Sequence, residues 1–230
     1  MKHIKPYKIF ESNSPNFPTT KEGVIEVCEK YKIIDYTIND DLSIDVDGGV
    51  NLNNMGLKYL PHRFNYVSGN FNCFVNKLKT LEGSPQTVDG DFSCYFNKLK
   101  TLKGSPQTVG GGFYCFDNKL ESLEGSPKTI NGDFDCSYNK LTDLEYFPEV
   151  NGSVTIYGNI VNLLVYTFVE NANTFLIENA NAFLIEDFVD YEIVRNGDTV
   201  MLDRLQTFIR DNNLRMPELE PIKNHYKIIE

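Results

Sequence analysis

The chain has 230 residues, a formal net charge of -10, 41% hydrophobic residues and 13% aromatic residues. This composition excludes a disordered chain, because enough apolar side chains are present to build a core. The net acidity disfavours a nucleic-acid-binding protein, which needs lysine and arginine to contact phosphates.

Residues 1–19 predict a flexible leader, which begins "MKHIKPYKIFESNSPNFP" and lacks the apolar core of a secretory signal. No stretch of the chain approaches the roughly 18 to 20 apolar residues of a membrane span. Five cysteines in a chain without an export signal indicate reduced thiols rather than a disulfide framework. We therefore expect a cytoplasmic protein.

Residues 20–45 predict a helix followed by a hairpin. The segment "TTKEGVIEVCEKYK" reads as a short helix with Thr20 near its N-cap, and its Cys28 is expected to be buried. The segment "DYTINDDLSIDVDG" alternates on either side of Asn39-Asp40-Asp41, which is typical of a hairpin. Together these elements would cap the first coil of the array that follows and cover its open edge.

Residues 46–164 contain a 21-residue repeat and predict a solenoid. Degenerate copies, "GGVNLNNMGLKYL" and "GSVTIYGNIVNLL", flank four regular units, as expected of terminal coils, so about six coils are predicted. The repeated cysteines and asparagines are Cys73, Cys94, Cys115, Cys136, Asn76, Asn97, Asn118 and Asn139.

Each unit predicts one short parallel strand. In "FSCY", residues 92–95, alternation points Phe92 and Cys94 into the core and Ser93 and Tyr95 outward. The segment "GSPQTV" predicts a return turn, and 21 residues leave no room for a full helix on the far side. A column of thiols about 4.8 Å apart packs as small hydrophobes and offers no tetrahedral zinc site. We therefore expect neither a metal nor another cofactor.

The pattern F-x-C-x-x-N-x-L-x-x-L resembles the leucine-rich repeat, L-x-L-x-x-N-x-L, with Phe and Cys in the two strand leucine positions. The resemblance implies an α/β solenoid, a slightly curved stack whose parallel strands line a concave face. It also implies that the asparagines bond to backbone groups of adjacent coils. The whole layout resembles leucine-rich-repeat proteins encoded by large tailed bacteriophages, a family whose activity is generally unassigned.

Residues 165–230 predict an acidic, mainly helical C-terminal cap. The segment "FVENANTFLIENANAFLIEDF" carries an eight-residue duplication with apolar residues at helical spacing, as in one or two amphipathic helices. The segment "DYEIVRNGDTVMLDRLQTFIRDNNL" predicts a short strand, a turn at Asn196-Gly197 and a last helix through about Asp211. The excess of acidic residues would favour basic partners or simply provide a solvated surface.

No set of residues in the sequence is typical of a catalytic site. The histidines lie in three different regions, and no phosphate loop, dinucleotide fingerprint or paired metal-ligand spacing occurs. Lysines also recur once per unit, directly after each asparagine, and are expected to be solvated. A phosphate or RNA backbone is the alternative ligand for them, which the net acidity disfavours. These lysines are Lys77, Lys98, Lys119 and Lys140.

Large aromatic residues at outward strand positions mark the candidate binding site on the concave face. Such side chains are enriched in interface hot spots, although rings of successive coils could instead stack on one another. The candidate partner-binding residues are Asn72, Phe74, Ser93, Tyr95, Tyr114, Phe116, Asp135, Tyr138 and Tyr157. We expect a non-catalytic protein that binds a host or viral protein in the cytoplasm of an infected bacterium, where it could sequester a defence factor.

The alternative function is a structural protein inside the virion. Internal head proteins of some tailed phages begin with a short capsid-targeting leader that ends in Ile/Leu-x-Glu, where the prohead protease cuts. Ile9-Phe10-Glu11 in "MKHIKPYKIFE" resembles this signal. This alternative predicts that virus particles contain a chain that begins at Ser12.

Overall fold

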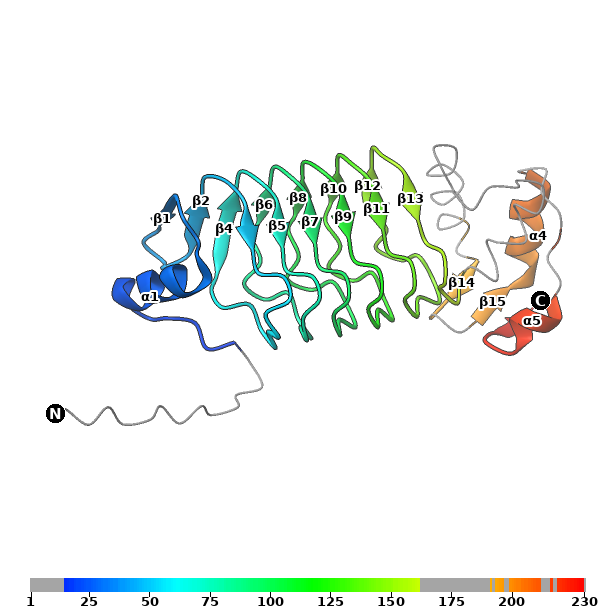
Figure 1. Ribbon diagram of the computed structural model, residues 1–230. Coiled ribbons are helices and arrows are strands. Elements are labelled where there is room, and N and C mark those ends of the chain that lie inside the picture. Colours follow the sequence, from blue (N-terminus) through cyan, green and yellow to red (C-terminus); the bar gives the residue numbers. More distant parts are fainter. Residues whose placement is uncertain are drawn as a thin grey trace.

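The computed structural model describes residues 15–161, 191, 193–196, 199–211, 216 and 219–229 (Figure 1). In these residues the chain forms a parallel-strand β-solenoid of about five turns, followed by a small unit of two helices and three strands. The predicted leader up to residue 14 and the predicted amphipathic helices in residues 165–188 lie outside the described residues.

Each turn of the solenoid contributes one short strand to each of two sheets. All neighbouring strands in both sheets are parallel except β1 and β2. The seven-stranded sheet consists of β1 (Tyr36–Ile38), β2 (Ile44–Val46), β4 (Phe64–Val67), β6 (Thr87–Val88), β8 (Thr108–Val109), β10 (Thr129–Ile130) and β12 (Glu149–Val150). The six-stranded sheet consists of β3 (Val50–Asn51), β5 (Phe71–Asn72), β7 (Phe92–Ser93), β9 (Phe113–Tyr114), β11 (Phe134–Asp135) and β13 (Val154–Thr155).

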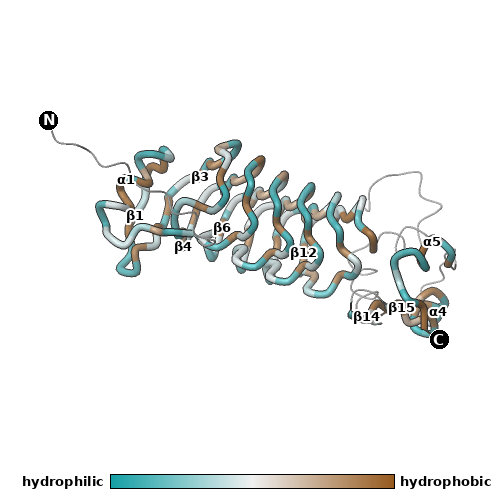
Figure 2. The backbone as a smooth tube through the Cα atoms, turned by 90° about the horizontal axis from the view of Figure 1, so that it is seen from below, coloured by the Kyte–Doolittle hydropathy of each residue, from teal (hydrophilic) through white to brown (hydrophobic). Residues whose placement is uncertain are grey.

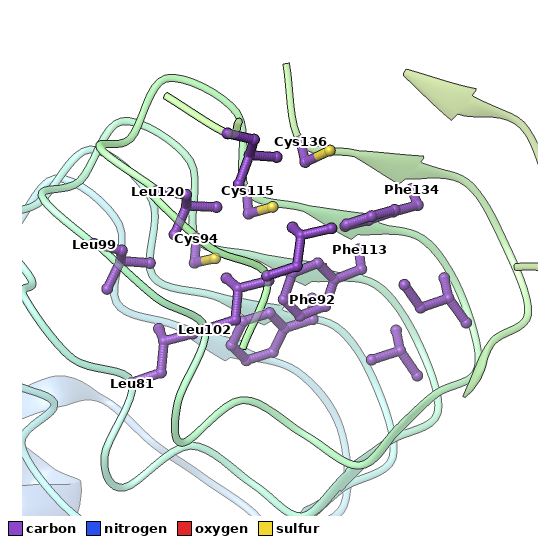
Figure 3. Close-up of a cluster of buried hydrophobic side chains, with 14 of the residues drawn as sticks. Leu81, Phe92, Cys94, Leu99, Leu102, Phe113, Cys115, Leu120, Phe134 and Cys136 are labelled. Atoms are coloured by element: carbon purple, nitrogen blue, oxygen red, sulfur yellow. The ribbon is translucent and has the colours of Figure 1, made fainter. Parts of the chain in front are cut away.

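The 21-residue period places equivalent side chains directly above one another. Phe71, Phe92 and Phe113 pair in register along the six-stranded sheet, and their rings stack with centroids 5.4 and 5.1 Å apart. Figure 3 shows the column of Cys94, Cys115 and Cys136 beside the phenylalanine column. Hydrophobic and hydrophilic stretches alternate in the same order from turn to turn (Figure 2). Each turn therefore closes one layer of a continuous core.

The second strand of each turn is a difference from the sequence prediction. The segment "GSPQTV" was expected to form only a return turn, whereas Thr87–Val88, Thr108–Val109 and Thr129–Ile130 form strands of the seven-stranded sheet. Glycine, serine and proline make the turn, and the β-branched pair that follows adopts the extended conformation it favours. Val88 and Val109 are fully buried, so these strands close the core on its second side.

The residues before the array form the helix and the hairpin that were predicted there. Helix α1 (Lys21–Tyr31) begins after Thr20, whose hydroxyl accepts a hydrogen bond from the Gly23 N–H at 3.2 Å. Strands β1 and β2 pair antiparallel, and β2 then pairs parallel with β4. Helix α1 lies at the start of the stack (Figure 1).

The C-terminal unit contains β14 (Val194–Arg195), β15 (Thr199–Met201), α4 (Leu202–Asp211), α5 (Leu219–Lys223) and β16 (Lys227–Ile229). The predicted strand and helix correspond to β14 and α4, while Gly197 of the predicted turn lies outside the described residues. The sequence did not predict β15 before this helix, and the helix is not the last one. The Tyr226 hydroxyl donates to the Thr142 carbonyl at 2.7 Å, which ties this unit to the solenoid. Among the described residues, no helix is long and apolar enough to cross a membrane.

Candidate protein-binding face

A ladder of buried and partly buried asparagines fixes the loops that follow the strands of the six-stranded sheet. The Asn97 amide donates to the Cys73 carbonyl of the preceding coil and to the Cys94 carbonyl of its own coil, both at 3.0 Å. Its oxygen accepts from the Leu78 N–H at 2.9 Å. Asn118, Asn139 and Asn159 repeat these contacts. The backbone next to the candidate face is therefore held rigidly.

The repeat cysteines form the core under this face and not a reactive site. All four are fully buried free thiols, as the alternation predicted. Burial raises the pKa of the Cys94 and Cys115 thiols, so they stay protonated and unreactive. Among the described residues, no group of three or more histidine, cysteine or acidic side chains could hold a metal ion.

Three aromatic side chains on the outward side form a stack, which we call the ring stack: Phe74, Tyr95 and Phe116. The Phe74 and Tyr95 centroids lie 4.5 Å apart, the Tyr95 and Phe116 centroids lie 4.3 Å apart, and all three rings are nearly parallel. The stacking that the sequence left as an alternative is thus present. Each such pair stabilises the fold by about 0.5–1.5 kcal/mol beyond its buried area, and all three ring residues remain partly exposed.

The other predicted binding residues differ in how much of them a partner could reach. Ser93 is buried despite its outward position, and Asn72, Tyr114 and Asp135 are half-buried. Tyr138 and Tyr157 are exposed and meet edge to face, with centroids 5.2 Å apart. The reachable part of the predicted set is therefore mainly aromatic.

Two of the predicted binding residues, Asp135 and Tyr114, have a shifted side-chain pKa. The Asp135 carboxylate accepts a hydrogen bond from the Ser137 N–H at 2.9 Å. Burial raises the pKa of this carboxyl, and its bonds to Ser137 only partly oppose that effect. Burial raises the pKa of the Tyr114 hydroxyl, and the nearby carboxylates of Asp91, Asp133 and Asp135 add to this effect. One flank of the ring stack is therefore acidic.

A second set of residues, which the sequence analysis did not recognise as a set, lies one residue beyond the ring stack. We call Val75, Phe96, Asp117 and Tyr138 the left-handed row, because their φ angles are 53°, 51°, 49° and 50°. This conformation reverses the chain between the outward-facing ring and the inward-facing asparagine. It is unfavourable for bulky and β-branched residues. Val75, Phe96 and Tyr138 are nevertheless apolar and are 41%, 49% and 53% exposed.

The flanking coils hold residues that suit this conformation. Asn54 in the first coil and Gly158 in the last take the equivalent position with φ of 55° and 74°. Asparagine and glycine enter the left-handed region at little cost. Aligning the degenerate coils with the regular ones would have indicated the row from the sequence, since asparagine, aspartate and glycine, which all enter the left-handed region readily, share this position in three coils.

The lysine column, Lys77, Lys98, Lys119 and Lys140, follows the left-handed row by two residues in each coil and is exposed. In the part of the chain that the structure describes, Lys77, Lys98 and Lys119 form no ion pair, whereas the Lys100 and Glu121 side chains pair at 2.8 Å. Lys100, and more weakly Lys140, lower the pKa of the Glu121 carboxyl. The apolar side chains therefore lie between an acidic and a basic flank.

The histidine with the most distinctive surroundings lies away from this face. His62 is fully buried between Phe17 and Phe64, and its Nε2 lies 2.6 Å from the Leu42 carbonyl oxygen. Burial lowers the pKa of its ring, so the histidine is neutral near pH 7. Its place in the core indicates a packing role.

No protein-family model, curated protein or solved structure matches this chain.

Proposed function

We propose that the protein is a non-catalytic binding module that recognises a protein partner through the ring stack and the left-handed row. The observation that carries this proposal is the exposure of Phe96 and Tyr138 beside three stacked rings on one side of a rigid sheet. Large apolar side chains that remain exposed together mark interaction sites more often than they mark ordinary surface.

The rigidity of the face supports the same function. The asparagine ladder and the stacked rings hold the aromatic side chains in one arrangement before any partner arrives. A preorganised surface loses less conformational entropy on binding, so more of the contact energy contributes to affinity.

The finer aspects of the proposal come from the resemblance. They comprise an α/β, leucine-rich-repeat type of solenoid with capped ends, a bacteriophage origin and a host or viral protein as the partner. Sequestration of a host defence factor in the bacterial cytoplasm is the form of activity that we consider first. The resemblance to phage proteins supports the choice of a bacterial lysate as the source of the partner.

The test compares capture by the full chain with capture by two double variants. We expect Tyr95→Ala with Phe116→Ala to weaken binding of a captured, purified partner by at least about 2 kcal/mol, as hot-spot residues do. Thr108→Ala with Thr129→Ala, on the seven-stranded sheet, is the matched control and should leave binding unchanged. Circular dichroism verifies the fold, because the stacked rings also contribute to stability. Unchanged binding by the Tyr95→Ala with Phe116→Ala variant, or loss of the partner in the control alone, would refute the proposed face.

A further inference from the structure

We infer that the left-handed row and the lysine column form a docking strip for an amphipathic α-helix whose apolar stripe is flanked by acidic residues. This inference rests on the proposed function and specifies its partner element. The helix would lie along the solenoid axis and cross successive coils. Its apolar stripe would contact Val75, Phe96 and Tyr138.

Contacts within the fold cover only part of the apolar side chains of the row. Phe96 meets Tyr95 and Phe116 edge to face, with centroids 5.7 and 5.6 Å apart, and still remains 49% exposed. Val75, Phe96 and Tyr138 each occupy a position where asparagine or glycine would be less strained, and each is exposed. Asn54 and Gly158 show that the same fold accepts those residues. Residues that their surroundings hold in a strained backbone conformation cluster at functional sites. A partner helix would contact the surface that these internal ring contacts leave exposed.

The charges beside the row indicate which residues should flank the apolar stripe of the partner helix. The exposed amines of Lys77, Lys98 and Lys119 have no carboxylate partner within 4 Å among the described residues. They line one side of the row at the spacing of the coils. A helix with glutamate or aspartate along that side would complement them, and its binding would weaken as salt screens the charges.

The spacing of the row favours a helix over an extended peptide. Coils repeat at about 4.8 Å, so Val75, Phe96 and Tyr138 lie at about 0, 4.8 and 14.4 Å along the axis. With a rise of about 1.5 Å per residue, helix positions i, i+3 and i+10 lie at about 0, 4.5 and 15 Å, within about 80° of one another. Same-face residues of an extended peptide repeat about every 6.7 Å. If one of them faced Val75, the next would therefore lie about 2 Å beyond Phe96 along the axis.

Asp117 would set the register of the helix. It occupies the third position of the row, about 9.6 Å from Val75, where the other members are apolar. Helix positions i+6 and i+7, at about 9 and 10.5 Å, would face it. A lysine there would meet the Asp117 carboxylate, and a leucine or glutamate would not.

Synthetic peptides of about 18 residues test the inference, because shorter helices are marginal in water even with favourable sequences. The first is a stapled helix with leucines at i, i+3 and i+10, lysine at i+7 and glutamates along one flank. The second replaces these glutamates by lysines, and the third rearranges the first composition into strand alternation. Fluorescence anisotropy with the full chain measures each dissociation constant. We expect the first peptide to bind at least tenfold more tightly than either of the others.

Variants of the protein locate the peptide. Phe96→Asn should fold, because Asn54 adopts the same conformation. We expect this variant to weaken binding of the first peptide at least tenfold. Lys98→Gln with Lys119→Gln should weaken binding of this peptide about fivefold and remove most of the salt dependence of binding. The matched control Thr108→Ala should leave it unchanged. Asp117→Asn should reduce the preference for lysine over leucine at i+7.

Three results would overturn the inference: tighter binding of the strand peptide, equal binding of the lysine-flanked helix, or no binding of any peptide at about 1 mM. Insensitivity of the first peptide to Phe96→Asn would overturn it as well. In each of these cases the proposed function would still stand if the ring-stack variant loses the captured partner, so the two failures can be told apart.

Discussion

Replacing Val75 by asparagine should stabilise the protein, although it removes a partly buried apolar side chain. Val75 is β-branched and has a φ of 53°, a conformation that costs such a residue about 2 kcal/mol. It is 41% exposed, so its burial contributes only about 1 kcal/mol. Asparagine fits the conformation, as Asn54 does in the first coil. The net gain is therefore about 1 kcal/mol.

Equilibrium unfolding in urea measures this gain. A gain of 1 kcal/mol should raise the midpoint by about 0.5 M without changing the slope of the transition, since m-values lie near 2 kcal/mol per molar urea for proteins of this size. Ile34→Asn is the matched control: Ile34 is 68% exposed and has no positive φ, so its replacement should leave the midpoint nearly unchanged. If Val75→Asn lowers the midpoint while Ile34→Asn does not, the packing of Val75 outweighs its strain and our reasoning is wrong.

Three further changes test the core and its charges. Cys94→Ser should lower the free energy of unfolding by about 1–3 kcal/mol, because it buries a hydroxyl without a partner, whereas Cys94→Val should be much milder in thermal unfolding; unfolding of the wild type by a chelator would contradict this. Asn97→Ala should cost about 3–5 kcal/mol in urea unfolding, since it leaves the buried Leu78 N–H and the Cys73 carbonyl without this partner. Burial lowers the pKa of His62, so the native state resists its protonation and stability should fall as the pH drops below about 6.5. Urea midpoints at pH 7.5 and 5.5 should differ less in His62→Gln than in the wild type, and an equal difference would exclude His62 as the cause.

The repeat period predicted the stack correctly because register requires only that equivalent residues recur at a fixed spacing. Phe92 pairs with Phe113 as the 21-residue alignment requires, and Cys94 lies inward as the alternation requires. The second sheet was missed because a pair such as Thr87–Val88 is too short to display a period of two. Proline beside it also suggested a turn alone.

The ends of the chain show where local patterns stop being informative. Helix α4 was predicted because ten residues display a clear apolar face, with Leu205 and Phe208 buried. Helix α5 was missed because "LEPIK" has five residues and contains a proline, which normally indicates a break. Strand β16 pairs with β15, which lies more than twenty residues earlier in the sequence, and such pairing leaves no local pattern.

Only the part of the candidate face that depends on local sequence patterns could be predicted from the sequence. Outward positions follow from strand alternation, so the side of the sheet on which Phe74, Tyr95 and Phe116 lie was predicted correctly, while their role in binding stays a prediction. Their stacking was only an alternative, because alternation says nothing about contacts between coils. The left-handed conformation of Val75 depends on the turn into the asparagine ladder, which three-dimensional contacts define.

The balance between the ladder and the row explains how this solenoid tolerates strain at its surface. Each ladder asparagine makes at least three hydrogen bonds to backbone groups, and at about 1 kcal/mol each these exceed the cost of one residue in the left-handed region. Because each coil contacts mainly its neighbours, the hydrogen bonds of each ladder asparagine offset the backbone strain of the left-handed residue in the same coil. The residue at the row position can therefore change from Phe96 to Asp117 between adjacent coils without altering the fold. Such a surface can vary its contacts one coil at a time, which is the property that a docking strip for a specific helix requires.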